Sequence, residues 1–235
     1  KRLKGEEGTI VKVGVLRGHE NMDFRIIRGK IPIYSIDATY MLDKTTGYIK
    51  LSRFAATTID EFEEAVKKLQ AQGMKDLILD LQTNGGGYMG AAIGIADHLL
   101  DGRKMIVYTD GVNSGRREEY STPIGLLQGG RVVVLIDGNS ASASEIVSGA
   151  VQDWDRGVLV GRRSFGKGLV QRQFPLTDGS MVRLTIAHYY TPSGRCIQKP
   201  YSKGEEDYEA ELYNRHRSGE MVSADSIVVN DSLKY

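Results

Sequence analysis

The sequence predicts an α/β protein built on a largely parallel sheet. Short apolar segments with strand character alternate with longer amphipathic segments along most of the 235 residues. This alternation is typical of chains whose parallel strands are joined by helices. A composition of 40% hydrophobic and 26% charged residues is that of a globular protein, and the length suffices for one sizeable core.

Charge and cysteine content exclude several classes of partner and site. A net charge of +1 gives no field that would draw the chain to nucleic acid or to an anionic membrane. No apolar run approaches the roughly 18 residues that span a bilayer. The single cysteine, Cys196, excludes an internal disulfide and a cysteine-rich metal site.

The first third of the chain contains strands followed by one strong helix. Alternating patterns predict short strands within residues 1–30 and another over 45–54. The run "TTIDEFEEAVKKLQAQG" predicts a helix that begins with a Thr58–Glu61 capping box and ends at Gly73. Its apolar face consists of Ile59, Phe62, Val66 and Leu69.

The middle of the chain alternates strands and helices. The buried strand "KDLILDL" leads into the loop "QTNGGG", and the helix "MGAAIGIADHLLDG" follows. Another helix starts near Ser142. The remaining segments read as strands: "KMIVY", "RVVVLID", "GVLVG", "LVQRQF" and "MVRLTIAHYY". Residues 201–235 are charged, rich in Tyr and short of aliphatic residues, which predicts a peripheral helix and tail.

Three serines alternate at the start of the helix near Ser142, in "DGNSASASEIVSGAVQD". A serine at a strand-to-helix junction gains from the free backbone N–H groups and the helix dipole, which can stabilise an oxyanion. Ser142 and Glu145 also form a capping-box pattern. On this stretch alone, helix capping explains the serines better than catalysis does, and a catalytic serine needs a base from elsewhere.

Lys167 is a better candidate base than any histidine. None of the four histidines lies in a glycine-rich or turn context, and structural or surface roles fit them. In "SFGKGLVQRQF", Lys167 lies between two glycines, and strand periodicity places Gln171 on its face. Burial beside apolar groups favours the neutral form of a lysine amine, which can then accept a proton from a serine. The ordinary alternative is an exposed lysine in a hairpin.

The same stretch is a poor phosphate-binding loop. Residues 161–167 match the first seven positions of the P-loop pattern, but Gly168 stands where the pattern needs Ser or Thr, and a strand follows instead of a helix.

The loop "QTNGGG" is a second candidate anion-binding segment, because consecutive glycines let the backbone approach a ligand and turn its N–H groups toward an anion. A tight strand-to-helix turn is its alternative reading.

Four segments carry a resemblance to a known family. "DLQTNGGG", "DGNSASASEI", "SFGKGLVQ" and "TPSGRCIQKP" resemble, in the same order, motifs of the carboxyl-terminal processing peptidases, or tail-specific proteases (family S41, clan SK). The resemblance covers residues from about 30 to 200. It implies a crotonase-like α/β core and a serine endopeptidase that cleaves near protein C-terminal tails without a metal or other cofactor.

The resemblance also implies the site residues. Ser142 would be the nucleophile, Lys167 the general base, and Gln171 the residue that orients the lysine. The backbone N–H of Ala143, with that of Gly86 or Gly87, would form the oxyanion hole. Glu145 would cap the helix or orient its surroundings, and Ser140 and Ser144 would be structural. One departure is Gln82, where the family usually has Arg.

The ends, the partners and the location are also expectations from the resemblance. Residues 1–30 resemble the closing part of a PDZ domain, residues 31–200 the catalytic core, and residues 201–235 the tail of Bacteroides-type members. Substrates would be proteins or peptides with accessible C-terminal tails, and the location would be the bacterial periplasm or envelope. The chain could self-associate through its core or through an open sheet edge. A non-catalytic peptide- or ligand-binding module of the same fold is the alternative function.

Overall fold

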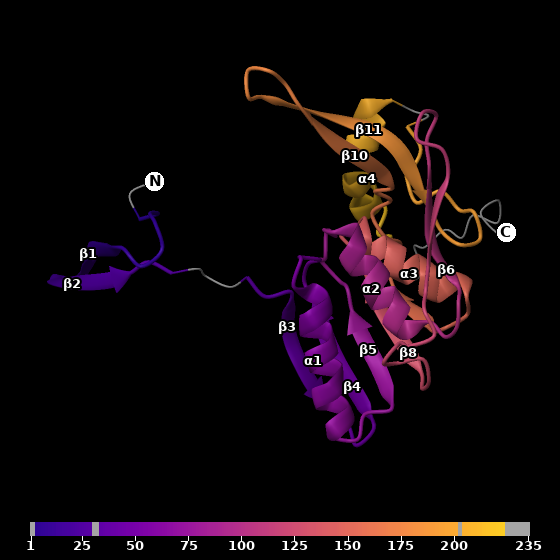
Figure 1. Cartoon of the computed structure of the whole chain (residues 1–235), viewed down its shortest axis with the longest axis horizontal. Helices are drawn as coiled ribbons and strands as arrows, with labels where there is room; N and C mark the ends of the chain where they lie inside the picture. The colour runs from indigo at the N-terminus through magenta and orange to yellow at the C-terminus, as the bar shows by residue number, and fades with distance from the viewer. Residues whose placement is uncertain (1–2, 30–32, 202–203, 224–235) are drawn as a thin grey trace. The chain divides into compact units, whose positions relative to one another are not determined.

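The computed structural model describes residues 3–29, 33–201 and 204–223 (Figure 1). The chain divides into two compact units, Lys1–Tyr34 and Ser35–Tyr235. The first unit contains the antiparallel pair β1 (Ile10–Arg17) and β2 (Glu20–Ile27). The turn between them places Gly18 at a φ of 63°, which glycine adopts without steric cost. The strands predicted within residues 1–30 are confirmed.

The second unit is built on a five-stranded sheet with the order β3-β4-β5-β8-β9. Its strands β4, β5, β8 and β9 run parallel, and β3 pairs antiparallel with β4. The parallel sheet predicted from the sequence is therefore present, while β3 was not predicted. The strand bounds are β3 Ile36–Met41, β4 Thr46–Leu51, β5 Asp76–Asp80, β8 Val132–Ile136 and β9 Val158–Gly161.

Helices α1 (Thr58–Ala71), α2 (Met89–Leu99) and α3 (Ala143–Asp153) pack with this sheet around one hydrophobic core. The predicted capping box of α1 is wrong. Thr57 is the N-cap, and the Glu61 carboxylate instead accepts the backbone N–H of Ser35 at 2.7 Å. The predicted end is confirmed, since Gly73 follows the helix at a φ of 101°.

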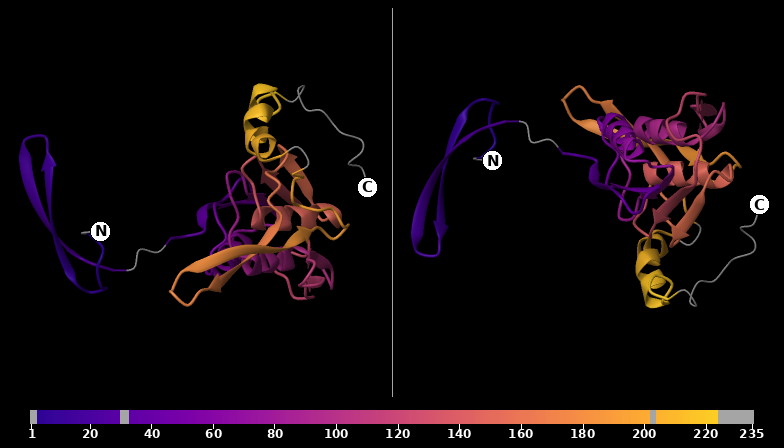
Figure 2. Two further views of the ribbon diagram at one scale, coloured as in Figure 1. Left: turned by 90° about the horizontal axis from the view of Figure 1, so that it is seen from above. Right: turned by 90° about the horizontal axis from the view of Figure 1, so that it is seen from below.

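A second sheet, with the order β10-β11-β6-β7, is antiparallel throughout. The prediction of a largely parallel sheet thus holds for only one of the two sheets of this unit. Strands β10 and β11 form a long hairpin (Figure 2). Most of its residues are exposed. The bounds are β6 Met105–Asp110, β7 Arg117–Tyr120, β10 Leu169–Pro175 and β11 Met181–Tyr190.

Helix α4 (Glu205–Arg217) lies at the side of the second unit away from α1 and α2 (Figure 2). The helix is as charged as its sequence predicts, but one of its basic side chains, Arg215, is only 5% exposed. The helix is therefore attached to the rest of the unit more firmly than a peripheral tail. Within residues 3–29, 33–201 and 204–223, no helix is both long and apolar enough to cross a membrane.

Candidate active site

The parallel pairing of β5 and β8 brings two loops together: the glycine loop (residues 81–88, between β5 and α2) and the serine loop (residues 137–142, between β8 and α3). Asp80 at the end of β5 lies opposite Leu135 of β8, so both following loops leave the same edge of the sheet, where parallel α/β sheets form their sites. Two backbone N–H groups donate from one loop to the other. Thr83 donates its N–H to Asp137 Oδ1 at 3.0 Å, and Ala141 donates its N–H to the Asn84 carbonyl at 3.0 Å.

The three alternating serines, Ser140, Ser142 and Ser144, have different environments. Ser140 and Ser144 are fully buried; the Ser140 hydroxyl donates to the Leu81 carbonyl at 2.8 Å and that of Ser144 to the Asn84 carbonyl at 2.9 Å. Ser142 is partly exposed and is the N-cap of α3. Its backbone has a φ of 55° and a ψ of −110°, which is unfavourable for a residue with a Cβ. Such strain is typical of functional positions.

The glycine loop lies directly against Ser142. A Cβ on Gly86 would be 2.8 Å from the Ser142 Cβ and 2.9 Å from the Ala143 nitrogen. Gly86 and Gly87 both have positive φ, 96° and 150°, and a Cβ on Gly87 would overlap the Phe54 carbonyl. Only glycine fits at either position without moving its neighbours.

The predicted oxyanion donors differ in their hydrogen bonding. The Gly86 N–H donates to Asn84 Oδ1 at 2.9 Å. Among the described residues, the N–H groups of Gly87 and Ala143 have no acceptor. Gly87 is exposed, whereas Ala143 is fully buried. The sequence did not decide between Gly86 and Gly87 as the second oxyanion donor. Of the two, Gly87 has the N–H group that is not already hydrogen-bonded within the described residues.

Asn84 is a residue of this site to which the sequence analysis assigned no role. It is fully buried, and its side-chain amide donates to the Leu51 carbonyl at 2.8 Å while its Oδ1 accepts the Gly86 N–H. Its own carbonyl accepts Ala141 and Ser144. Asn84 thus holds the glycine loop against both β4 and α3. The signal in the sequence was an amide residue directly before consecutive glycines.

Glu145 connects the serine loop to the lysine loop (residues 162–168, between β9 and β10). Its side chain is 4% exposed, and one carboxylate oxygen accepts the backbone N–H groups of Ser142 at 2.7 Å and Lys167 at 2.9 Å. The other oxygen accepts the Gly166 N–H at 2.6 Å and the Ser164 hydroxyl at 2.7 Å. Burial raises the pKa of the Glu145 carboxyl, and these four hydrogen bonds offset only part of the rise. The capping box predicted from Ser142 and Glu145 is present.

The side chains of Lys167 and Gln171 are both exposed. Lys167 lies in the loop between β9 and β10, and Gln171 lies on β10, opposite Thr185, where the register of the hairpin shifts. Within the described part of the chain, no hydrogen bond joins the Lys167 amine to the Ser142 hydroxyl. The structure therefore brings the backbone of Lys167 to the serine loop, but the amine is not buried as the sequence analysis expected.

The alternatives to a Ser142–Lys167 pair are a histidine base, a metal ion and a P-loop. His98 stacks on Phe62 and lies 3.3 Å from a Glu63 carboxylate oxygen, and no histidine among the described residues hydrogen-bonds Ser142. The described ranges also contain no group of three His, Cys, Asp or Glu residues placed to hold a metal ion. Lys167 is followed by strand β10 and not by a helix, which rules out a P-loop at this place.

Comparison with known proteins matches residues 45–209 to peptidase family S41. The chain is 36% identical over 204 residues to a carboxy-terminal-processing protease of Bartonella bacilliformis, covering 84% of this chain and 46% of that protein. It is 38% identical over 206 residues to a carboxyl-terminal-processing protease of a Synechocystis strain, covering 84% and 47%. The chain thus spans about half the length of these relatives.

Two solved structures are similar to this chain. A photosystem II D1 C-terminal processing protease is similar with a TM-score of 0.64 and 31% identity, covering 83% of this chain and 54% of that one. A putative S41 protease of Bacteroides fragilis is similar in fold, with a TM-score of 0.60 at 15% identity, covering 92% and 62%.

Proposed function

The chain belongs to peptidase family S41, and from this we propose that it is a serine endopeptidase that cleaves proteins near their C-terminal tails. Ser142 is the nucleophile and Lys167 the general base. The observation that supports this assignment best is Glu145, whose carboxylate accepts the N–H groups of both residues. That contact fixes the backbone of the proposed base relative to the backbone of the proposed nucleophile.

The proposed reaction is an acyl transfer. Lys167 accepts the Ser142 proton, the serine oxygen attacks the peptide carbonyl, and backbone N–H groups stabilise the oxyanion. The lysine then returns the proton to the leaving amine, and water hydrolyses the acyl-enzyme. Gln171 orients the lysine amine. A substrate lying over the exposed lysine would exclude water, which favours the neutral form of an amine.

Ala143 and Gly87 are the proposed oxyanion donors. Both N–H groups lack an acceptor within the described residues, and α3 begins at Ala143, where its dipole favours negative charge. Because Ala143 is buried beside Gly86, the glycine loop has to shift for both groups to face one oxygen.

A serine-directed fluorophosphonate tests the dyad. We expect one labelled residue, mapped by mass spectrometry to Ser142, with labelling abolished in Ser142→Ala and strongly reduced in Lys167→Ala. Ser180→Ala, an exposed serine in the β10–β11 turn, is the matched control and should label normally. Wild-type labelling in Lys167→Ala would reject the lysine, and a folded chain that takes no label would favour a non-catalytic binding module.

Tail specificity is tested separately. An unstructured protein is digested and the cut positions are mapped. We expect cuts to cluster near its C-terminus, as the names of the similar proteins imply for those proteins. Cuts spread evenly along the substrate would leave a serine endopeptidase without tail preference.

We further propose that residues 31–200 form a crotonase-like core, that residues 1–30 are the closing part of a PDZ domain, and that the protein acts in the bacterial periplasm or envelope. The parallel sheet with α1 to α3 supports the first assignment and the β1–β2 hairpin the second. The location rests on the family alone. Superposition of an experimental structure on a crotonase-like core and on a PDZ domain tests the two fold assignments. Cell fractionation tests the location.

A further inference from the structure

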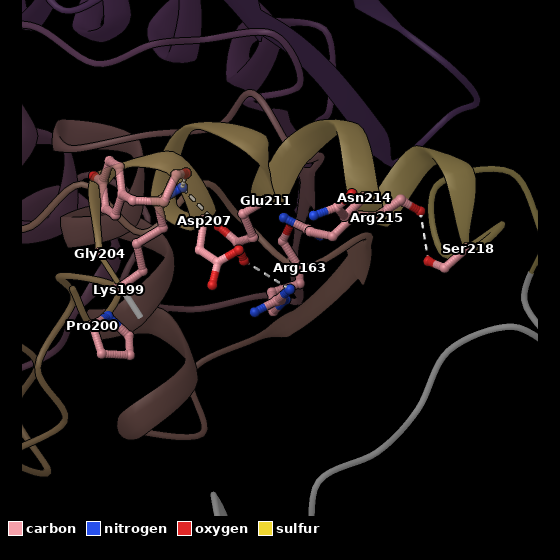
Figure 3. A pocket seen from close by; sticks show the side chains of 10 residues that line it. Arg163, Lys199, Pro200, Gly204, Asp207, Glu211, Asn214, Arg215 and Ser218 are labelled. Atoms are coloured by element: carbon pink, nitrogen blue, oxygen red, sulfur yellow. Dashed lines mark hydrogen bonds and ion pairs between the residues drawn. The ribbon is translucent and has the colours of Figure 1, made fainter. Parts of the chain in front are cut away.

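Arg215 on α4 is a buried charge that points into the loop preceding Lys167. Its Nη2 donates to the Arg163 carbonyl at 2.7 Å and its Nη1 to the Ser164 carbonyl at 3.3 Å, while its Nε donates to Glu220 at 2.8 Å. Figure 3 shows this guanidinium beside Arg163 and Glu211. A guanidinium is a rigid planar fork, so three simultaneous contacts fix the position of the two carbonyls.

These two carbonyls belong to a loop that is held on its other side by Glu145. Ser164 accepts Arg215 through its carbonyl and donates to Glu145 through its hydroxyl, at 2.7 Å. Lys167 follows three residues later and is itself bound to Glu145 through its N–H. The backbone leading to the lysine therefore lies between α4 and α3, with a polar contact to each.

A second route joins α4 to the residues that flank Lys167. The Gly166 carbonyl accepts the Lys199 N–H at 3.0 Å, and the Gly168 N–H donates to Gln198 Oε1 at 3.0 Å. Gln198 in turn donates to the Tyr208 hydroxyl at 3.1 Å, and the Lys199 amine donates to Glu211 at 2.7 Å. Tyr208 and Glu211 are both on α4.

Five charged groups on this side of α4 pair with one another: Arg163, Lys199, Glu211, Arg215 and Glu220. Arg163 lies 3.0 Å from Glu211 and 3.5 Å from Glu220, in a pocket of about 470 Å³ between α4 and the loop (Figure 3). Burial alone would raise the pKa of Glu211, but the hydrogen bond and charge of Lys199 and the charges of Arg163 and Arg215 together lower it. Glu211 and Glu220 therefore each already pair with a basic group, and Arg163 joins both of them to the loop before Lys167.

We infer that α4 positions the catalytic lysine, and that Arg215 is the positioning residue through which it acts. The inference rests on the proposed Ser142–Lys167 dyad. A general base works only within hydrogen-bond reach of the proton it removes, and a loop between two strands is intrinsically mobile. Arg215 contacts this loop before Lys167, and Gln198, which α4 holds through Tyr208, contacts it after Lys167. The exposed amine therefore starts from a restricted backbone.

The test is the rate at which a fluorophosphonate labels Ser142 in a set of single and double variants. Arg215→Met removes the donors and keeps an apolar stem. Arg217→Met is the matched control, because Arg217 is exposed on the same helix and makes no side-chain hydrogen bond or ion pair within the described residues. Each substitution is made in the wild-type chain and in Lys167→Ala, and folding is checked by thermal unfolding and circular dichroism.

If Arg215 acts through the lysine, Arg215→Met lowers the labelling rate on the order of tenfold in the wild-type chain and leaves the residual rate of Lys167→Ala unchanged. Arg217→Met changes neither. Arg215→Lys keeps a cation but loses the fork, so its loss is intermediate. If Arg215→Met does not fold, Arg215→Lys takes its place in the comparison. Its effect on the labelling rate should likewise disappear in the Lys167→Ala chain.

Two results would overturn the inference. One is an Arg215→Met rate equal to wild type. The other is an equal fold-reduction with and without Lys167, which would show that Arg215 acts on Ser142 or on the whole fold. A Lys167→Ala chain that labels at the wild-type rate rejects the dyad itself, so failure of the proposed function is seen in a different variant.

Discussion

Glu145 accepts the backbone N–H of Lys167 at 2.9 Å, across a sequence separation of 22 residues. The same carboxylate oxygen accepts the N–H of Ser142. One buried side chain therefore sets the distance between two backbone segments that the proposed reaction needs together. A carboxylate suits this task because it has two oxygens that only accept hydrogen bonds, and all four neighbouring groups are donors.

The first prediction concerns Glu145→Gln. The amide retains one acceptor oxygen and turns N–H groups toward donors, so at least two contacts are lost. We expect the free energy of unfolding to fall by about 1–3 kcal/mol and kcat to fall on the order of tenfold with a smaller effect on KM. Glu64→Gln, on an exposed position of α1, is the control. A variant that keeps its kcat would show that Glu145 stabilises the fold only.

The second prediction is the pH dependence of stability. Burial raises the pKa of the Glu145 carboxyl above its ordinary value of 4.5, so the folded chain binds this proton more tightly than the unfolded chain. The stability from this group is full below the unfolded pKa and is lost as pH rises through the folded pKa. The difference in unfolding free energy between wild type and Glu145→Gln should therefore shrink from pH 4.5 toward neutral pH. Denaturant unfolding over this range measures it, and a growing difference would contradict it.

The third prediction concerns Gly86→Ala. The added methyl group would lie 2.7 Å from the Ala141 carbonyl and 2.9 Å from the Ala143 nitrogen, and the positive φ disfavours alanine by about 1 kcal/mol. We expect probe labelling of Ser142 to fall at least about tenfold. Gly85→Ala is the matched control, since its Cβ would meet nothing within 4 Å. Equal labelling in both variants would remove the glycine loop from the site.

The fourth prediction concerns Asn84→Ala. The substitution leaves the buried Leu51 carbonyl and the Gly86 N–H without their partner. Each unsatisfied group costs about 1–3 kcal/mol, so a large loss of stability and a loss of labelling should appear together. Asn113→Ala, at an exposed position, should change neither. Denaturant unfolding and labelling of the same samples decide whether the two losses are linked.

Local sequence patterns predicted much of the fold. The apolar spacing of α1 places Phe62, Val66 and Leu69 in the core, and Gly73 ends the helix with a positive φ. These features depend on residues within one helix, so periodicity suffices to predict them. The alternation of strands and helices likewise predicted the parallel sheet, but it said nothing of the antiparallel sheet, whose strand β7 is short, charged and exposed at three of four positions.

The contacts that sequence reasoning missed are those between distant segments. Glu61 binds Ser35 rather than capping its own helix, Asn84 reaches Leu51, and Arg215 reaches Arg163. A capping pattern in the sequence does not show whether an N–H group from a distant segment binds the same carboxylate. The proposed roles of Ser142 and Lys167 likewise came from the family resemblance and not from periodicity.

The site draws on residues from Leu51 to Arg215, so it is complete only when nearly the whole second unit has folded. Contacts close in sequence form before contacts that close long loops. During refolding from denaturant, helical circular dichroism should therefore recover first, and reactivity at Ser142 should recover in a later phase. The recovery of reactivity at Ser142 would then report the last step of folding.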